Sequence, residues 1–180
     1  MCGIAGEVSF SNSVIKNKDS FLKMQKVLAP RGPDQNGIYI KDKVALIHSR
    51  LCVIDIENGL QPMSAKYGEN EYILVYNGEL YNTDEVRDEL KAHGHKFFGH
   101  SDTEVILKAY IEWKDECVNK FNGIFAFAIW DDKEQRLFFA RDRIGVKPLF
   151  YTVTDNSFIF GSEIKALLEH KFVEPIIDEN

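Results

Sequence analysis

Residues 124–130 read Ile-Phe-Ala-Phe-Ala-Ile-Trp, a run of seven apolar side chains without polar alternation. A strand of this composition is typical of a sheet that is buried on both faces. Other short strands are predicted before and after it, in groups, and the predicted helices come in pairs. This grouping predicts an α+β fold in which antiparallel sheets are layered and the helices lie outside.

The other elements follow from hydrophobic periodicity and from turn signals. Strands are expected at 2–10, 37–40, 44–48, 72–76, 137–140, 149–152 and 158–160, and helices at 21–28, from 82, from 101 and at 163–169. Asn77-Gly78 is a strong turn signal, so it is expected to end the strand 72–76. Asn82 with Glu85, and Ser101 with Glu104, have the spacing of a capping box.

The composition restricts the class of protein. A chain of 180 residues with 44% hydrophobic residues predicts one domain with a sizeable core. The net charge of −6 comes from interspersed acids and bases, which argues against a nucleic-acid or anionic-membrane partner. No apolar run approaches the roughly 20 residues of a membrane span, and the N-terminus does not resemble a signal peptide. We therefore expect a soluble, cytoplasmic protein.

The cysteines and histidines suggest no metal site. Cys2, Cys52 and Cys117 are few, odd in number and far apart, which favours reduced thiols over a disulfide framework or a zinc site. The five histidines show no metal-ligand spacing.

Cys2 is the candidate nucleophile. Its side chain is small, so methionine aminopeptidase is expected to remove Met1 and leave a thiol and a free α-amine on one residue. An α-amine has an ordinary pKa near 7.7–8.0, which suits a general base at neutral pH, and no separate histidine is then required. Gly3 and Gly6 favour close approach of a backbone or ligand to this segment. The alternative is that position 2 simply holds a small residue.

Five positions could bind an amino acid and its reacting amide. The fork of Arg50 matches the two oxygens of a carboxylate, although an exposed arginine is the alternative. Asn77 and Gly78 could donate a side-chain NH₂ and a backbone N–H to an oxyanion, whereas the alternative is an ordinary hairpin turn. Glu79 and Asp102 could bind an α-ammonium, but an acid at a helix N-terminus is also favoured by the helix dipole.

Seven segments together resemble a known family. They are Met1-Cys2-Gly3-Ile4-Ala5-Gly6, Arg31-Gly32-Pro33-Asp34, Arg50 with 51–55, Tyr76-Asn77-Gly78-Glu79-Leu80-Tyr81-Asn82, Gly99-His100-Ser101-Asp102-Thr103-Glu104, 121–128 and 141–149. In this order they resemble class II glutamine amidotransferases, which are N-terminal-nucleophile hydrolases. The last two resemble the glutaminase domain of glutamine-hydrolysing asparagine synthetases in particular.

The resemblance implies a four-layer αββα sandwich and a role for each candidate residue. It assigns Cys2 as the nucleophile that forms a thioester, and Asn77 with Gly78 as the oxyanion hole. Arg50 would bind the α-carboxylate of glutamine, with backbone groups lining the same pocket and two acids as candidates for the α-ammonium. The other substrate-binding positions are therefore Leu51, Val53, Ile54, Glu79 and Asp102, and the loop near the nucleophile supplies Arg31 and Asp34. The implied chemistry needs no metal or organic cofactor.

The resemblance also implies a larger protein. Residues 1–170 would form the glutaminase domain, and residues 171–180 would begin a linker to a synthetase domain, absent from this sequence, that uses ATP and Mg²⁺ to activate aspartate. The implied partners are glutamine and that synthetase domain, and a homodimer is one possible assembly. The alternatives are a non-catalytic domain, a domain that keeps Met1 and lacks the amine base, or the glutaminase domain of another class II amidotransferase.

Overall fold

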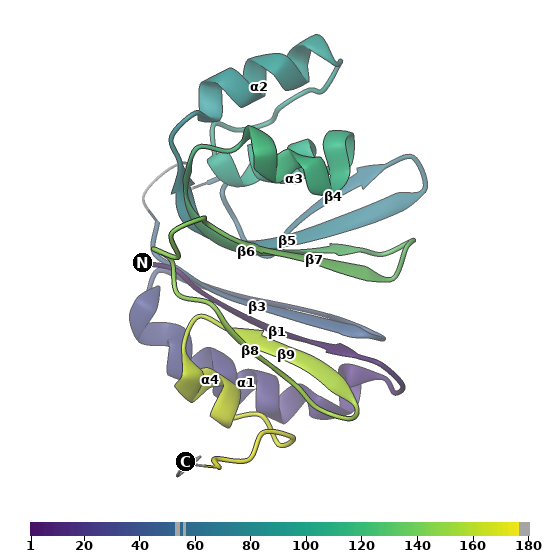
Figure 1. The fold of residues 1–180 in the computed structure, drawn as a ribbon, viewed down its shortest axis with the longest axis vertical. Coiled ribbons are helices and arrows are strands. Elements are labelled where there is room, and N and C mark those ends of the chain that lie inside the picture. The colour runs from purple at the N-terminus through teal and green to yellow at the C-terminus, as the bar shows by residue number, and fades with distance from the viewer. Residues whose placement is uncertain (53–54, 56, 177–180) are drawn as a thin grey trace.

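The computed structural model describes residues 1–52, 55 and 57–176, and its elements form four layers (Figure 1). The helices α2 (Thr83–Ala92) and α3 (Asp102–Trp113) lie over one sheet. The helices α1 (Lys18–Leu28) and α4 (Ile164–Leu168) lie over the other sheet, and the two sheets face each other. The predicted α+β fold, a four-layer αββα sandwich of antiparallel sheets, is confirmed.

Every strand pairing in the two sheets is antiparallel. One sheet has the order β2-β3-β1-β9-β8, and the other has the order β4-β5-β6-β7. The strands are β1 (Gly3–Ser9), β2 (Gln35–Lys41), β3 (Val44–Arg50), β4 (Met63–Tyr67), β5 (Asn70–Leu80), β6 (Gly123–Asp131), β7 (Arg136–Arg141), β8 (Phe150–Val153) and β9 (Ser157–Gly161). Short 3₁₀ turns lie at Val14–Asn17, Ala29–Arg31 and Lys114–Lys120.

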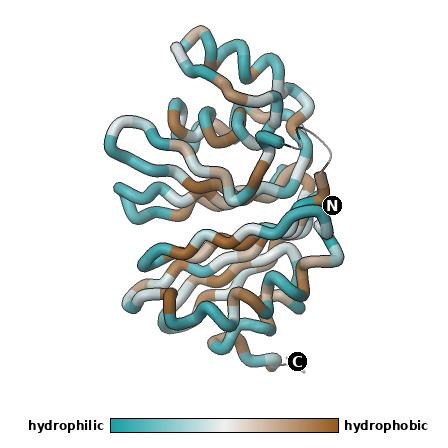
Figure 2. Tube along the Cα trace, turned by 180° about the vertical axis from the view of Figure 1, so that it is seen from behind, coloured by the Kyte–Doolittle hydropathy of each residue, from teal (hydrophilic) through white to brown (hydrophobic). Residues whose placement is uncertain are grey.

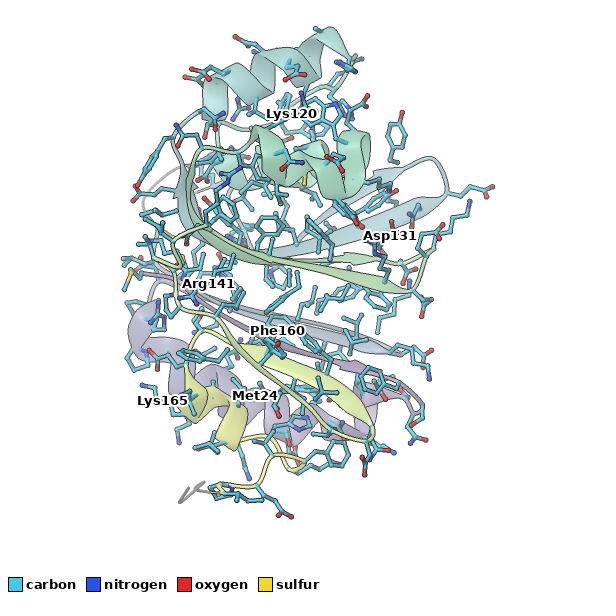
Figure 3. The ribbon with its side chains drawn as sticks, viewed as in Figure 1. Met24, Lys120, Asp131, Arg141, Phe160 and Lys165 are labelled. Carbon is cyan, nitrogen blue, oxygen red and sulfur yellow. The ribbon has the colours of Figure 1, made fainter. Side chains whose placement is uncertain are left out.

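Three apolar clusters separate the four layers. Trp130 and Phe160 belong to the cluster between the sheets, and Figure 3 shows Phe160 in that space. Met24 belongs to the cluster under α1, and Tyr110 to the cluster under α2 and α3. In Figure 2, hydrophobic positions recur along the strands, whereas α2 at the outside is mostly hydrophilic. The interior strand β6 is buried on both faces, as its composition predicts, because apolar layers lie above and below it.

The prediction that Asn77-Gly78 ends a strand is wrong. β5 continues through both residues to Leu80, with Asn77 opposite Ala126 and Gly78 opposite Phe125 on β6. Pairing with a long partner overrides the local turn preference of the dipeptide. Glycine is nevertheless required here, because a Cβ on Gly78 would lie 2.5 Å from the carbonyl oxygen of Ile124.

The two predicted capping boxes form only in part. Ser101 caps α3, since its Oγ accepts a hydrogen bond from the Glu104 amide at 3.3 Å. Asn82 precedes α2 but makes no cap hydrogen bond, because its Oδ1 accepts from the Asn122 amide at 2.9 Å.

The sequence also did not predict β4. No helix in the described part of the chain is both long and apolar enough to cross a membrane.

A buried hydrogen-bonded pair, Glu7 and His170, attaches the C-terminal part of the described chain to β1. The Glu7 carboxylate and the His170 ring are fully buried, with His170 Nε2 3.0 Å from Glu7 Oε2. Asn17 Nδ2 and Ser157 Oγ also donate to this carboxylate. Burial raises the pKa of Glu7, but the hydrogen bonds from His170, Ser157 and Asn17 outweigh it, so the pKa is lowered on folding. The charged form of Glu7 therefore stabilises the folded state.

We expect His170→Leu to lower the free energy of unfolding at pH 7 by roughly 3–5 kcal/mol, because it removes one partner of a buried pair. Chemical denaturation would measure this loss. The matched control is His93→Leu, whose imidazole contacts Glu112 at the surface, and which should cost at most about 1 kcal/mol.

The loss of stability in His170→Leu should depend on pH, and the direction of this dependence follows from the pKa of Glu7. Stabilisation by a carboxyl whose pKa falls on folding is present above its ordinary pKa, about 4.3 for glutamate, and is lost as the pH falls. The difference in the free energy of unfolding between wild type and His170→Leu should therefore become smaller below that pH. Equal losses in the two histidine variants would contradict the role of the buried pair.

Candidate active site

A cavity of about 170 Å³ opens at the edge of the sandwich where the chain begins. The N-terminus lies at this edge, level with the gap between the two sheets (Figure 1). The lining residues come from the start of the chain, the ends of β3 and β5, the β3–β4 loop, the start of α3 and the segment after β7. They are Met1, Cys2, Arg50, Leu51, Gly59, Gln61, Tyr76, Asn77, Gly78, Glu79, Asp102, Thr103 and Lys147.

Cys2 is partly buried at this cavity, immediately before β1. Its Sγ lies 3.6 Å from the carbonyl oxygen of Leu51, to which the thiol donates. Burial raises the pKa of the Cys2 thiol, and the backbone of Leu51 and the positive charges of the N-terminus and Arg50 offset only part of this effect. The side chain is therefore a neutral thiol near pH 7, so it needs a base to become a nucleophilic thiolate.

The loop with Arg31 and Asp34 holds the backbone on both sides of the cavity. Arg31 Nε donates to the carbonyl oxygen of Cys2 at 2.9 Å, and Arg31 also forms an ion pair with Glu163 at 3.0 Å. The Asp34 amide donates to the carbonyl oxygen of Arg50 at 3.0 Å. Neither side chain lines the cavity, and this loop contacts the backbone of two residues that do, Cys2 and Arg50.

Arg50 is the last residue of β3, and its side chain is almost fully buried. Its Nη2 donates to the carbonyl oxygen of Asp55 at 2.7 Å. Gly59 packs directly against the guanidinium, because a Cβ at that position would lie 2.3 Å from Arg50 Nη2. Two further predicted substrate-binding residues, Val53 and Ile54, lie outside the described residues.

Asn77 places a buried side-chain amide at the cavity. It is 2% exposed, and its Nδ2 has no hydrogen-bond partner among the described residues. The amide of Tyr76 donates to the Gln61 side chain and not to β6. Alternate residues of an antiparallel strand direct their N–H groups to the same side, so the N–H of Gly78 also points away from β6.

Asp102 is the first residue of α3, where its buried carboxylate lines the cavity. Its Oδ2 accepts hydrogen bonds from the Tyr76 hydroxyl at 2.8 Å and from the Leu80 amide at 3.2 Å. Burial raises the pKa of Asp102, and these donors oppose the increase. Glu79 also lines the cavity, but it is exposed.

None of the residues that line the cavity is a histidine. His48 is fully buried, and burial lowers its pKa to about 4, so its imidazole is neutral near pH 7. No group of three or more His, Cys, Asp or Glu side chains in the described part of the chain could hold a metal ion.

Besides Met1, which is expected to be removed, five of the lining residues were not predicted from the sequence. Tyr76 and Thr103 are adjacent to predicted positions, and Lys147 belongs to the segment 141–149 that carries the family resemblance. Gly59 and Gln61 lie in the loop between β3 and β4, where no motif marks them. Their contribution depends on how that loop packs against β5, which no local pattern in the sequence indicates.

Residues 1–180 match the family of glutamine amidotransferase domains, so the chain belongs to this family. It is 51% identical over 178 residues to the glutamine-hydrolyzing asparagine synthetase 3 of Bacillus subtilis, covering 99% of this chain and 29% of that protein. It is 40% identical over 171 residues to asparagine synthetase 1 of the same organism, covering 93% of this chain and 27% of that protein. The chain thus spans less than a third of the length of these relatives.

Two solved structures share the fold. One is a glutamine phosphoribosylpyrophosphate amidotransferase from B. subtilis, with a TM-score of 0.76 and 22% identity over 92% of this chain and 43% of that chain. The other is described as the allosteric regulatory enzyme of purine biosynthesis, with a TM-score of 0.74 and 20% identity over 93% of this chain and 43% of that chain. Both likenesses support the predicted sandwich fold.

Proposed function

We propose that this domain hydrolyses glutamine to glutamate and ammonia through a thioester on Cys2. The observation that carries the proposal is one small cavity that combines a thiol, a guanidinium, a carboxylate and an unpaired amide donor. Glutamine matches this set group by group, because it has an α-carboxylate, an α-ammonium and a side-chain amide. Membership of the glutamine amidotransferase family supports the same substrate.

In this proposal, opposite charges in the cavity hold the ends of the substrate. Arg50 binds the α-carboxylate through its fork, with Leu51 beside it, and Asp102 binds the α-ammonium. Both side chains are buried, so a zwitterionic ligand would meet two charges of opposite sign in a site shielded from water. Glu79 adds a second negative charge at the exposed side of the cavity.

The reaction begins at the Cys2 thiol. Since burial raises its pKa, the α-amine exposed by removal of Met1 accepts the thiol proton as sulfur bonds to the side-chain carbonyl carbon of glutamine. The side chain of Asn77 and the N–H of Gly78 stabilise the oxyanion. The proton then passes to the leaving nitrogen, ammonia departs, and water hydrolyses the thioester to glutamate and regenerates the thiol.

We further propose that the ammonia supplies a synthetase domain that forms asparagine. The support is the identity of 51% and 40% to proteins named as asparagine synthetases, which are more than three times as long as this chain. On this proposal residues 1–170 are the glutaminase domain, residues 171–180 begin the linker, and ATP with Mg²⁺ belongs to the second domain. Ammonia transfer to another acceptor, as in other class II amidotransferases, is the alternative.

A glutaminase assay on protein whose N-terminus is verified by intact mass tests the proposal. Protein without Met1 should release glutamate, whereas protein that retains Met1 should not, because its Cys2 nitrogen is then a peptide nitrogen. Cys2→Ala should abolish the activity and leave the fold unchanged by circular dichroism, since only one sulfur atom is removed. Full glutamate release by Cys2→Ala would exclude Cys2 as the nucleophile.

Asn77→Ala should lower kcat by about 10²–10³, which is the usual effect of losing one oxyanion-hole donor. The change in KM should be smaller, because the oxyanion exists only during reaction. Asn119→Ala is the control at an exposed position, and its steady-state kinetics should match wild type. A rise in KM with unchanged kcat in Asn77→Ala would instead identify Asn77 as a binding residue.

Arg50→Ala and Arg50→Lys should act on KM and kcat/KM more than on kcat. The α-carboxylate keeps its charge throughout the reaction, so its contact with Arg50 stabilises ground and transition states alike. Lysine keeps the charge but loses the bidentate fork. Steady-state kinetics would measure both variants.

A substrate analogue provides the control for Arg50. The analogue 4-aminobutanamide lacks the α-carboxylate, so wild type should hydrolyse it poorly. Arg50→Ala should have nearly the same activity as wild type on this analogue, because the contact is already missing. If the variant loses as much activity on this analogue as on glutamine, Arg50 supports the fold or the nucleophile and does not bind the carboxylate.

A further inference from the structure

Tyr76 occupies a part of β5 that has no strand neighbour on one side. The pairing of β4 with β5 ends where Met63 lies opposite Leu74, whereas β5 continues to Leu80. Beyond Leu74, the backbone groups that point away from β6 must find other partners, because an unpaired buried peptide group is costly. Tyr76 is 3% exposed, so water does not satisfy these groups.

Two buried side chains take the place of the missing strand. Gln61 Oε1 accepts a hydrogen bond from the Tyr76 amide at 2.6 Å. His48 Nε2 lies 2.9 Å from the carbonyl oxygen of Tyr76. Since a carbonyl only accepts, Nε2 carries the proton and donates. The backbone of Tyr76 is therefore held from both the β3–β4 loop and the opposite sheet.

The ring extends this arrangement into the cavity. The Tyr76 hydroxyl donates to Asp102 Oδ2 at 2.8 Å. Burial, together with the charge of Asp102, raises the pKa of Tyr76 well above its ordinary value, so the hydroxyl remains a donor. Every hydrogen-bonding group of Tyr76 thus has a side-chain partner, and each partner comes from a different segment of the chain.

We propose that Tyr76 is a positioning residue that orients the Asp102 carboxylate toward the α-ammonium of glutamine, and that it thereby contributes to selectivity for amino acids. This inference rests on the function proposed above. Asp102 begins a helix that packs on the outer face of the sheet, so its orientation at the cavity depends on contacts with β5. Without the hydroxyl, the carboxylate keeps the hydrogen bond from the Leu80 amide and those from the backbone at the start of α3 itself, so it loses its one side-chain donor among the described residues.

The test compares Tyr76→Phe with wild type on two substrates. The variant keeps the ring and loses one hydrogen bond to a charged group, so KM for glutamine should rise roughly 10- to 100-fold with kcat within about twofold. Glutaramate is glutamine without its α-amino group. On glutaramate the two proteins should have the same kcat/KM within about twofold, since there is no ammonium to bind.

Tyr72→Phe is the matched control. Tyr72 is another buried tyrosine of β5, but its hydroxyl accepts from Lys114 and does not line the cavity, so its kinetics on glutamine should equal those of wild type. The proposal would be overturned if Tyr76→Phe lowered kcat/KM as much on glutaramate as on glutamine. It would also be overturned if the variant lowered kcat and left KM unchanged. Either result would mean that Tyr76 supports the site as a whole.

A binding measurement separates this proposal from the glutaminase proposal. Isothermal titration of glutamine into Cys2→Ala and into Cys2→Ala/Tyr76→Phe measures affinity without turnover. The double variant should bind glutamine roughly 10- to 100-fold more weakly than Cys2→Ala does. The two proteins should bind glutaramate with equal affinity. If the double variant shows this selective loss of glutamine affinity while wild type without Met1 releases no glutamate, the glutaminase proposal is refuted and the role of Tyr76 in binding is left intact. Absence of glutamine binding to Cys2→Ala would refute both.

Discussion

The pairing of β5 with β6 beyond the end of β4 is the constraint on which the cavity depends. β6 continues opposite β5 from Tyr72 to Leu80, whereas β4 stops opposite Leu74. One side of β5 therefore has peptide groups without a strand partner at the edge of a buried sheet. The cavity forms where these groups, the start of β1 and the end of β3 come together, so a difference in strand length creates the site.

Burial determines the chemistry of this cavity. It raises the pKa of the Cys2 thiol and of the Asp102 carboxyl, and it leaves the Asn77 amide without a partner among the described residues. The charged forms of Cys2 and Asp102 and the unpaired amide of Asn77 are therefore less stable there than in water. A ligand with complementary charges and a reacting carbonyl would compensate them together, which is the physical reason that such a cavity is selective.

Much of the fold and of the site could be predicted from the sequence. The apolar run 124–130 indicated a strand buried on both faces, and the structure confirms it as an interior strand between apolar layers. The family resemblance named Cys2, Arg50 and Asp102, which the structure brings to one cavity. The turn expected at Asn77-Gly78 was wrong, because local preference cannot indicate that a distant strand will pair with those residues.

The sequence by itself determined the layered α+β fold, the family and the residue types available for chemistry. These properties depend on composition, hydrophobic period and short motifs, which are local. The tertiary structure alone decided that Gln61 and His48 replace a strand beside Tyr76, and that the Tyr76 hydroxyl reaches Asp102. Such contacts join residues 15 to 28 positions apart in the chain, and they exist only because packing of the sheets and of α3 brings these segments within hydrogen-bond distance.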